Sequence, residues 1–116
     1  MHKKKEDGLM FHRKIIIIGV LALGISLSAQ VFAHTPLCSC YDNADGTVTC
    51  EGGFSDGSSA AGVEMRVQDK NGKVLIKGKM DEDSEFTFYK PSGPYTVVFD
   101  AGEGHVVEID GKEIVE

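Results

Sequence analysis

The sequence predicts an all-β protein: a small antiparallel Greek-key sandwich of about seven strands, preceded by a hydrophobic N-terminal signal or anchor helix. Two observations predict the sandwich. Short stretches alternate apolar and polar residues, and turn signals separate them at intervals of about 8 to 12 residues. In addition, every turn is short, which suits antiparallel neighbours, because a parallel crossover needs about a dozen residues or more.

Residues 1–33 have the layout of a secretory signal peptide, with a basic start, an apolar run over Ile15–Leu27 and a small residue, Ala33. Val31 and Ala33 suit the positions before a cut, so cleavage after Ala33 would make His34 the first residue. The alternative is an uncleaved membrane anchor, since a spanning helix needs about 20 residues. Both alternatives place the remainder in the periplasm or on the outer face of the cytoplasmic membrane, because the basic cluster stays inside.

The exported part is small and acidic. Residues 1–33 hold five of the 12 basic and two of the 18 acidic side chains, which leaves seven basic and 16 acidic residues and a net charge of −9. This charge argues against nucleic acid as a partner and fits a cation or a basic protein surface. A chain of about 80 residues buries only a modest core, so a disulfide or metal would help to stabilise it.

The first predicted strands form hairpins. Asp45-Gly46 is a turn signal that joins a short cysteine-containing strand to Thr47–Glu51. In Val63–Gln68 apolar and polar side chains alternate cleanly, and Asn71-Gly72 supplies the positive φ of a tight turn before the return strand Lys73–Met80.

The later strands follow the same logic. An acidic turn precedes Glu85–Lys90, and a turn containing two prolines separates it from Tyr95–Gly102. After a Gly-rich turn the chain resumes as His105–Asp110, and Asp110-Gly111 predicts a last hairpin into Lys112–Glu116.

Three segments follow from this reading: a signal peptide or membrane anchor over 1–33, a cysteine-containing hairpin over 34–52, and a β-sandwich domain over 53–116. The irregular stretch Gly52–Gly62 is predicted as a surface loop, since no helix follows it to complete a phosphate-binding cradle. Asp42–Thr47 resembles the start of a calcium loop but lacks the glutamate that such a loop needs at its twelfth position. We therefore interpret it as a hairpin turn.

All three cysteines lie within this hairpin. The turn brings Cys50 opposite either Cys40 or Cys38, so the disulfide candidates are Cys40–Cys50 and Cys38–Cys50. A loop of about ten residues closed in this way would contribute about 2 to 3 kcal/mol. The third cysteine is left as a metal ligand or a reactive thiol, and all three are candidate metal ligands.

The two histidines of the exported part are the other candidate ligands. If His34 is the N-terminal residue, its α-amine and its imidazole can chelate one ion, and Ni²⁺, Co²⁺ or Cu²⁺ prefer such nitrogens. His105 alternates with Val107 and Ile109, so its alternative role is that of a partly buried structural histidine. No set of residues predicts catalysis, because a Cys-His pair would need an orienting partner and an oxyanion pocket.

Gly62–His105 resembles carboxypeptidase-regulatory or transthyretin-like sandwich domains, whose repeat runs G-x-V-x-V-x-D-x-x-G-K, G-x-T-D-E-x-G-x-F-x-F and Y-x-V-x-x-x-A-G-x-G-H. The sequence departs from this repeat at Met80, where the pattern has Thr, and at Ser84, where it has Gly. The alanine before His34 and the run Ala101–His105 also resemble small exported accessory components of energy-coupling-factor (ECF) type nickel/cobalt uptake transporters.

The resemblance implies a non-enzymatic, exported protein that handles Ni²⁺ or Co²⁺ transiently beside the membrane subunits of such a transporter. It implies His34 and His105 as metal-handling residues, whereas the cysteines are additional to the sandwich pattern. The alternative function is a structural or protein-binding sandwich module whose cysteines only staple the hairpin.

Overall fold

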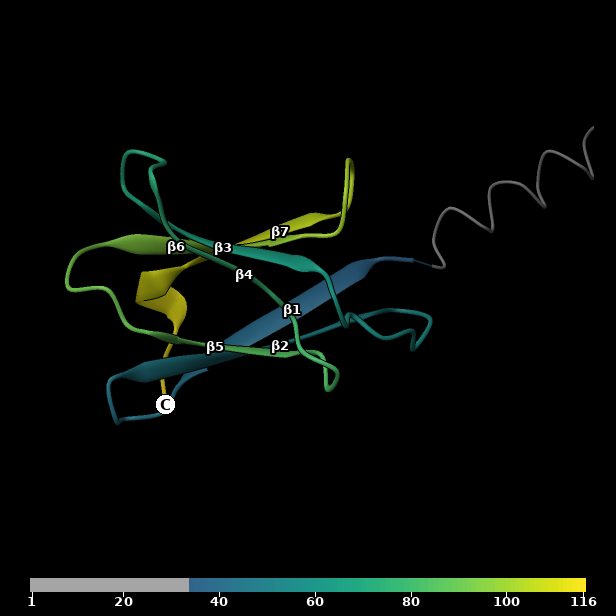
Figure 1. Cartoon of the computed structure of the whole chain (residues 1–116), viewed down its shortest axis with the longest axis horizontal. Coiled ribbons are helices and arrows are strands. Elements are labelled where there is room, and N and C mark those ends of the chain that lie inside the picture. Colours follow the sequence, from purple (N-terminus) through teal and green to yellow (C-terminus); the bar gives the residue numbers. More distant parts are fainter. Residues whose placement is uncertain (1–33) are drawn as a thin grey trace, which may run out of the picture. The chain divides into compact units, whose positions relative to one another are not determined.

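The structure is a computed structural model that describes residues 34–116 (Figure 1). The predicted signal peptide or anchor, residues 1–33, lies outside the described residues. The described part is all-β, as predicted, with seven strands in two antiparallel sheets. The strands are β1 (Pro36–Asp42), β2 (Thr47–Phe54), β3 (Glu64–Asp69), β4 (Val74–Lys79), β5 (Glu85–Tyr89), β6 (Tyr95–Asp100) and β7 (Val106–Asp110).

The smaller sheet contains three strands in the order β1-β2-β5. The predicted turn at Asp45-Gly46 joins β1 to β2, and β5 pairs with the other edge of β2. The cysteine-containing hairpin therefore supplies two of the three strands of this sheet.

The larger sheet contains four strands in the order β4-β3-β6-β7. The predicted turn at Asn71-Gly72 joins β3 to β4, and the Asp69 carboxylate accepts hydrogen bonds from the backbone N–H groups of Asn71 and Lys73. The chain crosses between sheets at β2–β3, β4–β5 and β5–β6.

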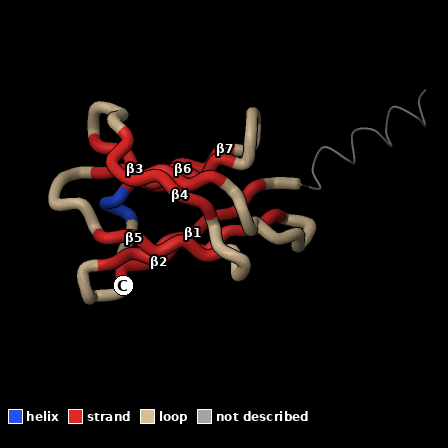
Figure 2. Tube along the Cα trace, viewed as in Figure 1, coloured by secondary structure: helices blue, strands red, loops and turns tan. Residues whose placement is uncertain are grey.

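The two sheets pack face to face, with β1 opposite β7 and β5 opposite β4 (Figure 2). The predicted alternation in β3 is confirmed, because Met65 and Val67 are fully buried between the sheets. Phe99 and Val97 on β6 and Val48 on β2 fill the same layer. At about 25 cal/mol per Å² of apolar surface, this layer is the main stabilising term of the fold.

Two glycines allow side chains of one sheet to approach the backbone of the other. A Cβ on Gly52 of β2 would lie 2.7 Å from Cε2 of Phe99, and a Cβ on Gly78 of β4 would lie 2.5 Å from Cε1 of Phe86. Both distances are shorter than van der Waals contact, so these aromatic rings require glycine. Gly52 was predicted at the start of a loop, but it lies inside β2, which continues to Phe54.

The C-terminus differs from the prediction, because Lys112–Glu116 forms no strand. The Asp110 carboxylate accepts a hydrogen bond from the Lys112 backbone N–H and begins a short 3-10 turn, Gly111–Glu113. Ile114 then enters the core, and the Val115 carbonyl accepts a hydrogen bond from the Asp42 N–H on β1. The tail thus passes from one sheet to the other, because burial of Ile114 outweighs the pairing of a further strand. No helix within residues 34–116 is long and apolar enough to cross a bilayer.

Candidate functional site

The register of the β1–β2 hairpin decides which cysteines meet. Cys40 lies directly opposite Cys50, with their Cα atoms 4.0 Å apart, and the two form a disulfide. Cys38 lies opposite Gly52 instead. Of the two pairings that the sequence allowed, the structure therefore forms Cys40–Cys50. A disulfide is typical of proteins that fold in an oxidising compartment.

Cys38 remains a free thiol beside this disulfide. It lies two residues before Cys40 on the same face of β1, and the sulfur atoms of all three cysteines lie within 4.8 Å of one another. Burial raises the pKa of the Cys38 thiol to about 11. At neutral pH Cys38 is therefore protonated, whereas metal binding requires the thiolate.

The redox state of the hairpin sets how many ligands this group offers. With the disulfide formed, only Cys38 can coordinate an ion. Reduction would present three thiolates, a donor set that suits soft ions such as Cu⁺ or Zn²⁺ better than it suits oxygen-seeking ions. Within residues 34–116 the cysteines are the one group of three metal-capable side chains that lie this close together.

His34 lies just before β1 and contacts the loop that follows β2. Beyond the last pair of the ladder, Pro36 with Phe54, the backbone N–H of Ser55 donates to the Thr35 carbonyl, and the Thr35 N–H donates to the Ser55 hydroxyl. One step further, Nδ1 of His34 lies 2.7 Å from Oδ2 of Asp56. The imidazole is 65% exposed, so its other faces remain open to solvent.

The Asp56 carboxylate is held in position by the turn that it begins. Its Oδ1 accepts hydrogen bonds from the backbone N–H and the hydroxyl of Ser58, at 2.9 and 2.6 Å, which leaves Oδ2 for His34. The Ser58 hydroxyl, the Ser58 N–H and the His34 imidazole lower the pKa of Asp56. The carboxylate is therefore ionised at neutral pH.

His105 lies in the turn between β6 and β7 and is exposed. Its Nδ1 lies 3.2 Å from the Glu103 carbonyl, and its backbone closes the turn through hydrogen bonds with Gly102 and Ala101. Alternation with Val107 suggested that His105 is a partly buried structural residue. In the structure His105 is exposed instead, because β7 begins only at Val106 and His105 lies in the turn before it.

Both histidines belong to the same end of the sandwich. The start of β1, the loop after β2 and the β6–β7 turn lie together at this end (Figure 1). The contacts between the strands agree with this placement, since β1 lies opposite β7. Cys38 follows His34 by four residues, about 13 Å along an extended strand. The structure thus separates the His34 position from the group of three sulfurs.

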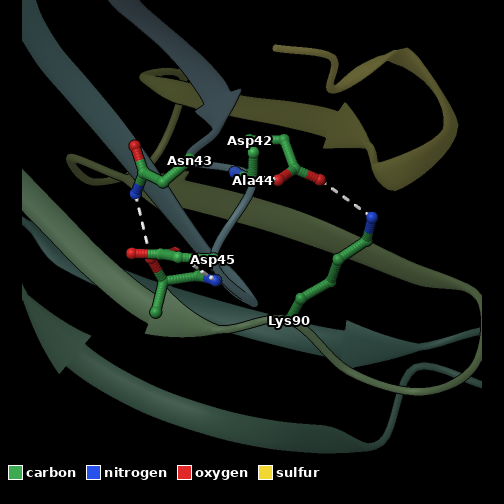
Figure 3. Close-up of polar contacts among 6 residues, drawn as sticks. Asp42, Asn43, Ala44, Asp45 and Lys90 are labelled. Carbon is green, nitrogen blue, oxygen red and sulfur yellow. Dashed lines mark hydrogen bonds and ion pairs between the residues drawn. The ribbon is translucent and has the colours of Figure 1, made fainter.

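The Asp42–Thr47 turn, at the opposite end, is a structural turn as interpreted from the sequence (Figure 3). The Asp42 carboxylate accepts hydrogen bonds from the Ala44 N–H and from the Lys90 ammonium group, 2.9 Å away. Asp45 accepts from the backbone N–H and the hydroxyl of Thr47. The Asn43 amide donates to the Thr47 hydroxyl, so the carboxylate and hydroxyl oxygens of this turn are engaged by the turn itself and by Lys90.

Asp56 contacts the candidate residue His34 but was not predicted from the sequence, because the composition of its loop indicates only a surface connection. The signal that identifies it is the hairpin register. If Cys40 pairs with Cys50 across the turn, each step towards the N-terminus on β1 matches one step towards the C-terminus on β2. Six steps from the disulfide, His34 meets Asp56.

Comparisons with protein families, with curated proteins and with solved structures found no match to this chain.

Proposed function

We propose that the chain is an exported, non-enzymatic accessory protein that binds Ni²⁺ or Co²⁺ transiently and assists their uptake by a membrane transporter. The proposed partners are the membrane subunits of an ECF-type nickel/cobalt transporter. The proposed location is the periplasm or the outer face of the cytoplasmic membrane, reached through the signal sequence in residues 1–33.

The observation that carries the proposal is the position of His34. It stands at the very start of the folded unit, anchored by the Thr35–Ser55 hydrogen bonds, yet its imidazole is 65% exposed. After cleavage behind Ala33 the α-amine and the imidazole would form one chelating pair at a fixed place on the surface. Nitrogen donors of this kind suit Ni²⁺ and Co²⁺. The net charge of −9 adds a long-range attraction for cations.

The two positions that depart from the repeat of transthyretin-like sandwiches are compatible with this fold. Ser84 stands where their repeat has Gly, and its φ of 60° lies in the left-handed region that favours glycine. Its hydroxyl accepts a hydrogen bond from the Ala60 N–H, which offsets part of the cost of that conformation. Met80, the other departure, is a core residue. Both departures thus have a local structural reason.

Calorimetric titration tests the proposal on the unit 34–116, which contains both sheets and the whole described core. With a free His34 N-terminus, the unit should bind one Ni²⁺ or Co²⁺. The control variant carries one glycine before His34, which removes the amine from the chelate and leaves every side chain in place. We expect it to bind at least about tenfold more weakly. Equal affinity of the two forms would refute an N-terminal His34 ligand.

A second candidate function is a protein-binding module whose disulfide only staples the hairpin. It is favoured by exposed apolar and aromatic side chains on the outer face of the three-stranded sheet: Leu37 (52% exposed), Tyr41 (39%) and Tyr89 (81%). Native mass spectrometry with added Ni²⁺ separates the two functions, because such a module would carry the disulfide and bind no metal ion.

A further inference from the structure

We propose that Asp56 is a direct ligand of the ion, so that the site is made by the His34 α-amine, the His34 Nδ1 and the Asp56 carboxylate. This inference rests on the proposed function and specifies its binding site. It assigns a role to the loop after β2, which is otherwise a surface connection.

The distance between His34 and Asp56 is close to the distance between two ligand atoms of one metal ion. Two ligand atoms that bind one ion at about 2.0 to 2.1 Å and at right angles lie about 2.9 Å apart. Nδ1 of His34 and Oδ2 of Asp56 are 2.7 Å apart, so an ion could bind both atoms once the two side chains turn their lone pairs towards it. Nδ1 is also the ring nitrogen that closes a six-membered chelate with the α-amine of the same residue. The same nitrogen can therefore bind the ion together with the α-amine of His34 and next to the Asp56 carboxylate.

The surroundings hold the carboxylate ready for this role. Oδ1 of Asp56 is fixed by two hydrogen bonds from Ser58, so Oδ2 points at the imidazole. Hydrogen-bonded partners of this kind orient metal-binding carboxylates in proteins. The Thr35–Ser55 hydrogen bonds fix the two backbones that carry His34 and Asp56. The carboxylate is therefore positioned from both sides before any ion binds.

Three protein ligands leave coordination positions of Ni²⁺ or Co²⁺ open. The His34 side chain is 65% exposed and the Asp56 side chain is 27% exposed, so an ion bound to both would be reachable from solvent. A second protein could supply its own ligands there before the three bonds to this chain break. A site of this kind suits the transfer of an ion better than its permanent storage.

The test compares Asp56→Asn with Asp45→Asn in the unit 34–116 with a free His34 N-terminus. Asp45 is a matched control, because it begins the same kind of turn at the opposite end of the sandwich, accepting from the backbone N–H and hydroxyl of Thr47. We expect Asp56→Asn to weaken Ni²⁺ binding at least tenfold in calorimetry and Asp45→Asn to leave it unchanged. Thermal unfolding without metal should show that Asp56→Asn remains folded, with at most a small loss of stability from the weakened contact with His34.

The outcomes are distinguishable. Tight Ni²⁺ binding by the parent with unchanged binding by Asp56→Asn would overturn the role of Asp56 and leave the proposed function standing. Absence of Ni²⁺ binding by the parent would overturn both. If Asp56→Asn unfolds, Asp56→Glu keeps a carboxylate on a longer stem, and we expect it to bind Ni²⁺ more tightly than Asp56→Ala. Equal binding by these two variants would also overturn the role of Asp56.

Discussion

At the residue scale, neighbouring cysteines have different chemistry because the hairpin register gives them different partners. Cys40 faces Cys50 and is oxidised, whereas Cys38 faces Gly52 and keeps its thiol. The sequence predicted one disulfide and one remaining thiol, but not which cysteine stays free. A shift of register by two residues would have made Cys38–Cys50, and spacing alone does not distinguish the two registers.

Cys38 should react slowly with alkylating reagents. Because burial raises its pKa to about 11, its thiolate is scarce at pH 8, and we expect iodoacetamide to label it at least about tenfold more slowly than in the same protein unfolded by urea. The rate in the folded protein should rise with pH up to about 11. Labelling is followed by mass spectrometry, and equal rates in the folded and unfolded states would contradict the buried, protonated thiol.

The raised pKa of Cys38 also determines how this thiol changes the free energy of unfolding with pH. The folded pKa of Cys38 lies above the unfolded value, so the fold favours the neutral thiol. This contribution to the free energy of unfolding is present below the unfolded pKa and is lost as the pH rises towards about 11.

At the element scale, alternation and turn signals predicted most strands, since burial of one face with period two is the main constraint on each strand. They failed at Lys112–Glu116 because Asp-Gly signals a hairpin only if a partner strand follows. Here the Asp110 carboxylate begins a 3-10 turn, and Ile114 inserts into the core. Burial of Ile114 thus outweighed the hairpin signal of Asp110-Gly111.

Contact between the sheets gives a prediction for Gly52. The Cβ of Gly52→Ala would lie 2.7 Å from Phe99 Cε2 and 3.0 Å from Met80 Cε, so the core must shift. We expect a loss of about 1 to 3 kcal/mol in the free energy of unfolding, seen as a lower midpoint in urea. Gly53→Ala is the control, because its Cβ faces outwards and meets nothing closer than the Ser58 carbonyl at 3.9 Å. Equal midpoints for the two variants would contradict the packing described.

Of the two residues at the candidate site, only His34 could be predicted from local sequence. His34 was identified from its place after the predicted cut, a local pattern. Asp56 follows it by 22 residues and meets it only through the hairpin register. A site residue supplied by a loop is found once pairing is known, because composition says nothing about what a loop faces.

At the scale of the whole molecule, the sandwich separates two chemistries. One end carries His34, Asp56 and the β6–β7 turn with His105, while the three sulfurs lie along the β1–β2 hairpin towards the interior. Hard and borderline ions would meet nitrogen and oxygen ligands at the exposed end, and the disulfide removes two of the three thiolates that would compete for them. The oxidised hairpin is thus compatible with the proposed nickel or cobalt site, because it leaves only one thiol to compete for the ion.

The central claim is that this chain, once exported and cut after Ala33, carries Ni²⁺ or Co²⁺ at His34. Native mass spectrometry of the protein purified from the exported fraction of cells, with Ni²⁺ added to the purified protein, tests it most directly. The account predicts the mass of residues 34–116, less two hydrogens for the Cys40–Cys50 disulfide, with one nickel ion bound. A mature protein that begins at another residue, or the same protein free of metal, would contradict it.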